Sequence, residues 1–112
     1  MDAEQVTRNN ALFRAANEGI RGAAERYRVE ELVPFLCECA DEQCTQLVRL
    51  PLVEYDAVRA HSTRFIIAPG HAAAEGETTV IVGERGDYLV VEKQGPAAGL
   101  VTDCRPRDQG KA

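Results

Sequence analysis

The stretch FLCECADEQC at residues 35–44 holds three of the four cysteines of this 112-residue chain. Side chains alternate between the two faces of an extended segment, so Cys37 and Cys39 point to the same face. The sulfur atoms of a tetrahedral zinc site lie only about 3.8 Å apart, which two such neighbours can match. A tight turn over ADEQ, residues 40–43, brings Cys44 to the same side. The stretch therefore predicts a β-knuckle that supplies three ligands to one metal ion.

The fourth ligand has to come from a distant part of the chain, and the two candidates are His71 and Cys104. His71 directly follows Pro69-Gly70, a chain break that presents its ring from a fixed loop. Cys104 lies in a polar tail, where holding a ligand costs conformational entropy. The other histidine, His61, follows a predicted helix and is explained by capping of the helix end. We predict a Zn²⁺ site with the ligands Cys37, Cys39, Cys44 and His71, and Cys104 is the alternative fourth ligand.

Three close thiols have other uses, namely a disulfide, packing as small apolar side chains, or an iron–sulfur cluster. A Cys37–Cys39 disulfide would close a strained ring, and thiols stay reduced in the cytoplasm. Ligand sets rich in sulfur also suit iron–sulfur clusters. A [2Fe–2S] protein, or a thiol-based redox sensor that uses the same ligands, therefore remains the alternative to a zinc protein.

On the N-terminal side of the stretch, residues 3–28 are predicted to form one long helix. Apolar residues recur there at spacings of three and four, which places them on one face, and we expect this face to pack on the core. Pro34 cannot continue a helix, so the cysteine-bearing segment begins as a strand. The predicted apolar stripe consists of Phe13, Ala16, Ile20, Ala23 or Ala24, and Tyr27.

On the C-terminal side, the sequence predicts a return strand at 46–50 and a short second helix at 51–60. Pro51 suits the first position of that helix, which we expect to contribute Val53, Ala57 and Ala60 to the core. The fold class is therefore α+β: a long N-terminal helix, the Cys-bearing knuckle, the short helix and a small antiparallel sheet with a C-terminal hairpin. The strands of this sheet are expected at 64–70, 78–82 and 87–93, and the last two flank the turn sequence GERG at 83–86.

Length and composition fit one zinc-stabilised domain, residues 1–103, followed by a mobile tail, residues 104–112. The N-terminal MDAEQVTRNN lacks the apolar segment of a signal peptide, and no run approaches the about 18 apolar residues of a membrane span. We therefore expect a cytoplasmic protein with no membrane attachment. The formal net charge of −5 opposes binding to phosphate backbones, so nucleic acid is not the expected partner.

Enzyme motifs are missing from the chain, among them a phosphate-binding loop, Gly-x-Ser-x-Gly, and the His-x-Glu motif of zinc deaminases. A zinc ion with four protein ligands is of the structural kind, because no position is open to substrate. The sequence therefore predicts a non-enzymatic zinc protein, a regulatory or protein-interaction module whose partner is another protein.

Two resemblances accompany these predictions. The Cys-x-Cys-x4-Cys spacing is similar to the post-SET zinc knuckle of protein lysine methyltransferases, but the rest of the chain is too short for a SET domain. The segments PFLCECADEQC, EYDAVRAHSTRF, APGH and YLVVEK resemble a family of small bacterial proteins of unassigned function, over residues 9–93. The second resemblance implies that the cysteines and His71 belong to a shared pattern, and it implies no activity.

Overall fold

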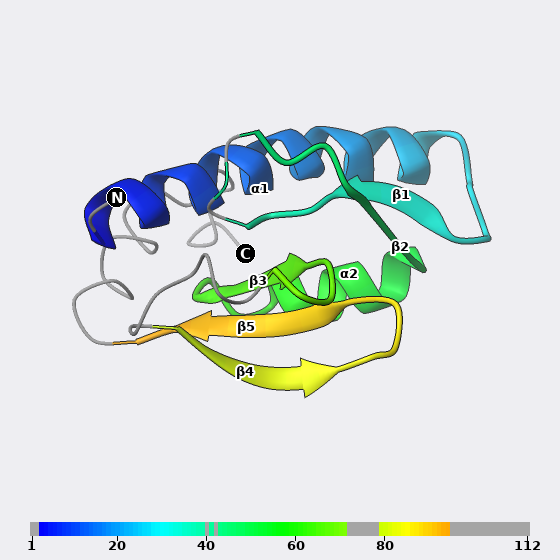
Figure 1. The fold of residues 1–112 in the computed structure, drawn as a ribbon. Coiled ribbons are helices and arrows are strands. Elements are labelled where there is room, and N and C mark those ends of the chain that lie inside the picture. The colour runs from blue at the N-terminus through cyan, green and yellow to red at the C-terminus, as the bar shows by residue number, and fades with distance from the viewer. Residues whose placement is uncertain (1–2, 40, 42, 72–78, 95–112) are drawn as a thin grey trace.

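The fold is α+β, and the computed structural model describes residues 3–39, 41, 43–71 and 79–94 (Figure 1). Helix α1 spans Ala3–Arg26 and helix α2 spans Leu52–Arg59. Strands β1 (Val33–Leu36) and β2 (Leu47–Leu50) pair antiparallel in one sheet. Strands β3 (Arg64–Ile67), β4 (Thr79–Glu84) and β5 (Leu89–Lys93) form a second antiparallel sheet in the order β3-β5-β4. The predicted fold class is confirmed.

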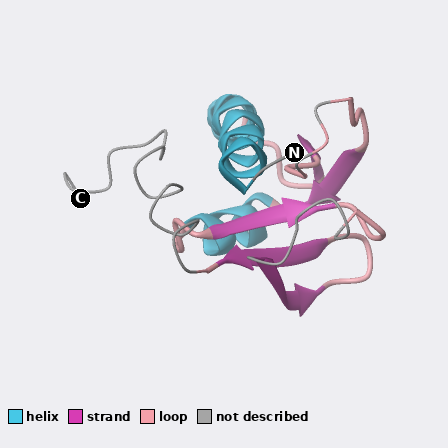
Figure 2. Ribbon diagram, turned by 60° about the vertical axis from the view of Figure 1, so that its left-hand side comes forward, coloured by secondary structure: helices cyan, strands magenta, loops and turns pink. Residues whose placement is uncertain are grey.

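The two sheets lie on different sides of the molecule. In Figure 1, α1 runs along the β1–β2 hairpin, and α2 lies with the three-stranded sheet. Figure 2 shows α2 against one face of that sheet. Among the described residues, no helix combines the length and apolar character needed to cross a membrane. The predicted tail at 104–112, with Cys104, lies outside the described residues.

The face that α1 turns toward the core carries polar as well as apolar residues, so the predicted apolar stripe is confirmed only in part, by Ile20 and Ala24. Ala24 is buried, but Ala16 is exposed and Tyr27, which follows the helix end, is 74% exposed. The fully buried positions of the helix are Asn10, Arg14 and Asn17. These positions also recur at spacings of three and four. Asn10 and Asn17 face polar backbone groups of the knuckle, and Arg14 donates to the Ser62 carbonyl and lies over the ring of Phe65.

Asn17 joins α1 to strand β1, because its side-chain amide pairs with both the N–H and the carbonyl of Leu36, as the backbone of a neighbouring strand would. Its Oδ1 accepts the backbone N–H of Leu36 at 2.7 Å, and its Nδ2 donates to the carbonyl oxygen of Leu36 at 2.9 Å. The same Nδ2 donates to Glu38 Oε2 at 2.7 Å. Two turns away, Asn10 Nδ2 donates to the backbone carbonyl of Glu38 at 2.7 Å. Side-chain amides thus satisfy backbone groups that would otherwise be buried without partners.

Glu38 joins the knuckle to the second sheet. Its backbone N–H donates to the carbonyl of Ile66 at 2.8 Å, and its Oε1 accepts the N–H of Ile66 at 2.9 Å. The side chain has no solvent exposure. Burial raises the pKa of the Glu38 carboxyl, whereas the positive charge of Arg59 and the hydrogen bond from Asn17 lower it. The knuckle is therefore held from both sides, by α1 and by β3.

Helix α2 also buries a different face from the predicted one. Val53 is 74% exposed, and Ala57 and Ala60 are exposed as well. Pro51 takes the extended N-cap position, and the helix begins one residue later. The core side carries Tyr55, whose ring stacks on Phe35 with centroids 4.2 Å apart. The large aromatic ring buries more apolar area than an alanine, and this decides which face packs.

The strands follow the predicted pattern more closely than the helices. In β2, Val48 and Leu50 are buried while Leu47 and Arg49 are exposed, as the alternation predicts. The C-terminal hairpin forms, but its turn lies later than GERG. Strand β4 continues through Gly83, with a bulge between Ile81 and Gly83, and the turn is closed by the bond from Arg85 N–H to the Tyr88 carbonyl.

Replacing Asn17 by Ala is expected to lower the free energy of unfolding by about 2–4 kcal/mol, because the buried partner groups on Leu36 and Glu38 lose their hydrogen bonds. Urea denaturation followed by circular dichroism measures this loss. The control is Leu12→Ala on the same helix, where the side chain is 65% exposed and the expected change is under about 0.5 kcal/mol. Equal losses in the two variants would contradict a polar docking face on α1.

Candidate metal centre

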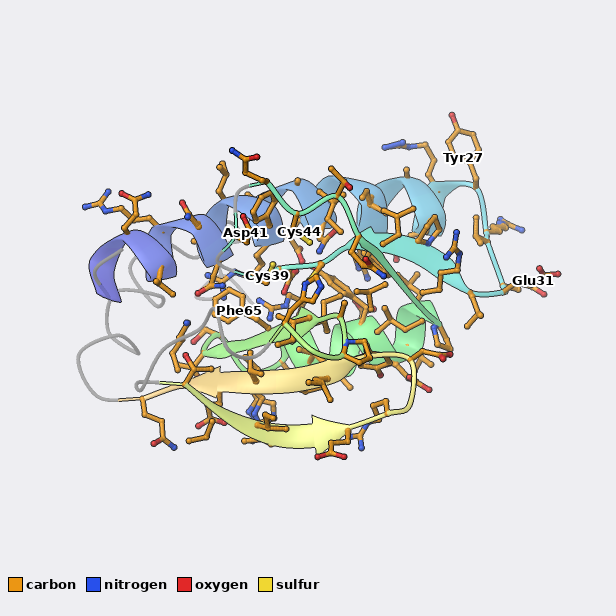
Figure 3. The ribbon with its side chains drawn as sticks, in the orientation of Figure 1. Tyr27, Glu31, Cys39, Asp41, Cys44 and Phe65 are labelled. Carbon is orange, nitrogen blue, oxygen red and sulfur yellow. The ribbon has the colours of Figure 1, made fainter. Side chains whose placement is uncertain are left out.

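The four predicted ligands lie together. One ligand atom from each of Cys37, Cys39, Cys44 and His71 can be chosen so that all four lie within 4.8 Å of one another. Figure 3 labels Cys39 and Cys44, whose side chains approach each other next to Asp41. The group could hold a metal ion, because its donor atoms are as close as the ligands of a single ion have to be.

The loop between β1 and β2 supplies the three thiols. Cys37 continues the hairpin, since its N–H donates to the carbonyl of Gln46 at 3.1 Å. Asp41 then forms the turn: its Oδ1 accepts the N–H of Gln43 at 2.9 Å, and its backbone carbonyl accepts the N–H of Cys44 at 3.0 Å. Aspartate is a favoured turn residue for this reason. The turn is the one that the polar residues at 40–43 predict, and the role of Asp41 in it is seen only in the structure.

His71 reaches the thiols from the end of β3. The chain turns at Pro69-Gly70, where Gly70 has a φ of 89°, a conformation that glycine adopts without steric cost. The turn is closed by a bond from His71 N–H to the Ala68 carbonyl at 3.1 Å. The Pro-Gly break therefore presents the ring as the sequence predicts.

The distances from the ring nitrogen support ligation through Nδ1. This atom lies 3.4 Å from Cys37 Sγ and 3.6 Å from Cys44 Sγ. In a tetrahedron with Zn–S bonds of about 2.3 Å and Zn–N bonds of about 2.0–2.1 Å, sulfur and nitrogen are about 3.5 Å apart. The observed separations match this geometry.

The thiols of Cys37 and Cys39 are almost completely buried, and Cys44 and His71 are half-buried. Burial raises the pKa of the Cys37 thiol, and the backbone N–H of Ala68, 3.1 Å from its sulfur, acts in the opposite direction. Burial also raises the pKa of the Cys39 thiol. Several thiolates in so buried a site need a cation beside them, and a metal ion held by this group would supply that charge.

Among the described residues, the group consists of these four side chains, and His61 is not one of them. His61 is exposed and follows α2, and Cys104 lies outside the described residues. The three cysteines of the described knuckle are free thiols and form no disulfide with one another. No family model, curated protein or solved structure matches this chain. The resemblance to small bacterial proteins therefore stays a prediction.

Replacing His71 by Ala is expected to weaken metal binding by more than about 100-fold, because loss of a ligand exceeds the 10–100-fold cost of losing a supporting hydrogen bond. Competition with a chromophoric chelator measures the affinity, and elemental analysis measures the metal content. His61→Ala is the matched control and should bind as the parent does. Weak binding by Cys104→Ser together with tight binding by His71→Ala would instead make Cys104 the fourth ligand.

Proposed function

We propose that this protein is a small zinc-binding module in which one structural Cys3His ion ties its two sheets together. The observation that carries this proposal is the convergence of four donor atoms within 4.8 Å from two separate parts of the fold. The thiols come from the β1–β2 loop, and His71 follows β3 of the other sheet. An ion at this position cross-links elements that otherwise meet through Glu38 and its neighbours.

The donor set favours Zn²⁺ over an iron–sulfur cluster. Three thiolates and one imidazole form a common tetrahedral zinc site. A [2Fe–2S] cluster divides its four ligands between two irons, so the ligands of one iron stand well apart from those of the other. The mutual closeness of all four donor atoms supports a single ion. The cluster or thiol-sensor alternative therefore has the weaker support.

A structural role fits better than a catalytic one. Four protein ligands complete a tetrahedron and leave no position for a substrate or a reactive water. The burial of Cys37 and Cys39 also keeps solvent from one side of the site. We therefore propose a regulatory or interaction module, with no enzymatic activity. The partner we propose is another protein, because the net charge of −5 repels phosphate backbones.

Metal removal is the test of this proposal. The protein is expected to contain one zinc ion per chain, and a strong chelator should lower its melting temperature by more than about 10 °C. The reason is that binding of structural zinc contributes of order 10 kcal/mol in small domains, comparable with the whole stability of a domain. Differential scanning calorimetry with and without chelator, followed by addition of Zn²⁺, measures the effect.

The variant Cys44→Ser lacks one ligand and is the control for this melt. Its melting temperature should be low and should respond little to chelator, while the parent recovers fully when Zn²⁺ is returned. A parent protein that melts at the same temperature without metal would refute a structural zinc. A brown protein with visible absorption after anaerobic purification would favour the iron–sulfur alternative.

A further inference from the structure

A second candidate site lies away from the cysteines and does not depend on the metal. A cavity of about 250 Å³ opens between α2 and the β4–β5 hairpin. Its volume exceeds the roughly 150 Å³ of an apolar cavity that accepts one benzene ring. It is smaller than the roughly 300–1,000 Å³ of pockets for drug-sized ligands. The size therefore suits a ligand with one ring or a short branched chain.

The inner wall of the cavity is apolar. Val58 of α2 and Val90 of β5 line it, and both are almost fully buried in the molecule. Ala57 and Val82 add further apolar surface. A ligand body without polar groups can displace water from this wall and gain the free energy of apolar burial.

Basic side chains surround this wall. Arg64, Arg85 and His61 all line the cavity. Arg64 pairs with Glu92 through its Nε, 2.8 Å from Glu92 Oε1. Among the described residues, this ion pair engages only the Nε, and the terminal nitrogens of the guanidinium fork remain for another acceptor.

The side chain of Arg85 packs over Gly83 of β4 and lines the cavity. Its Cζ lies 3.5 Å from the position that a Cβ on Gly83 would occupy, so the guanidinium packs directly against the glycine. The bulge between Ile81 and Gly83 lies at the same place. Bulges often redirect side chains next to binding sites. The side chain thus folds back from the hairpin turn to the cavity.

Among the described residues that line the cavity, Glu54 carries the single carboxylate, and this group already has a donor. The Tyr88 hydroxyl donates to Glu54 Oε1 at 2.6 Å. Burial, followed by this contact with Glu54, raises the pKa of Tyr88 to about 12, so the hydroxyl keeps its proton at neutral pH. Of the two arginines that line the cavity, Arg64 shares its charge with Glu92 through Nε, and Arg85 has no ion pair among the described residues.

We propose that this cavity binds a small carboxylate with an apolar body. The carboxylate accepts hydrogen bonds from Arg85 and from the terminal nitrogens of Arg64, because a guanidinium fork matches its two oxygens. The body rests on Val58 and Val90. Inorganic phosphate is also an anion, but it has no apolar part that could displace water from the inner wall.

Benzoate is the probe, and benzyl alcohol and benzylamine are its neutral and cationic analogues. Titration into the full-length, metal-loaded protein is followed by NMR through the methyl groups of Val58 and Val90. Benzoate should give saturable shifts. The two analogues and inorganic phosphate should bind at least about fivefold more weakly, because each lacks either the charge-assisted hydrogen bonds or the apolar body.

Three variants test whether benzoate binds in this cavity. Arg85→Gln should weaken benzoate binding about fivefold, and Arg49→Gln, the same change at an exposed site on β2, should leave it unaltered. Glu92→Gln should strengthen binding about twofold, because it removes the competing charge at Arg64. Shifts that do not saturate, equal binding of benzyl alcohol, or equal effects of the two arginine variants would overturn the proposal.

Discussion

The buried carboxylate of Glu38 is the constraint on which the rest of the structure depends. It lies between two candidate ligands, Cys37 and Cys39, and has no contact with solvent. A carboxylate in that position is unfavourable unless hydrogen bonds compensate its lost hydration. Asn17 supplies one bond from α1, and the N–H of Ile66 supplies another from β3. The position of the helix and the position of the second sheet are therefore both tied to the same side chain.

This arrangement divides the metal centre into two parts of different character. Cys37 and Cys39 are buried on either side of Glu38, where the N–H of Cys37 bonds the Gln46 carbonyl and the N–H of Glu38 bonds the Ile66 carbonyl. Cys44 and His71 are half-buried and come from turns. The first pair is pre-organised by the protein, and a metal ion at this site would supply a link to the second pair. Such a division would let folding energy and metal-binding energy support each other, as in small metal-binding domains.

Structure that neighbouring residues decide follows from the sequence of this protein, and structure that distant residues decide does not. The alternation of β2, the turn before Cys44 and the break before His71 are local, and all three were predicted. The buried face of α1 was predicted only in part, and that of α2 was not. A periodic search selects apolar positions such as Ala16 and Val53, but the surroundings of α1 are backbone groups and a carboxylate, which no spacing along the helix reveals. In such surroundings an asparagine, whose amide both donates and accepts hydrogen bonds, is favoured over an apolar residue at a buried position.

By itself, the sequence determined the pieces of this protein: extended cysteines on one face, a Pro-Gly turn ahead of a histidine, and an α+β order of elements. These follow from steric and turn preferences, which act between residues close in the chain. Only the tertiary structure decided that His71 meets Cys37 at 3.4 Å, that polar side chains of α1 enter the core, and that α2 and the hairpin line a cavity with two arginines. Those outcomes depend on the balance between desolvation and hydrogen bonding across elements, which exists only once the elements have packed.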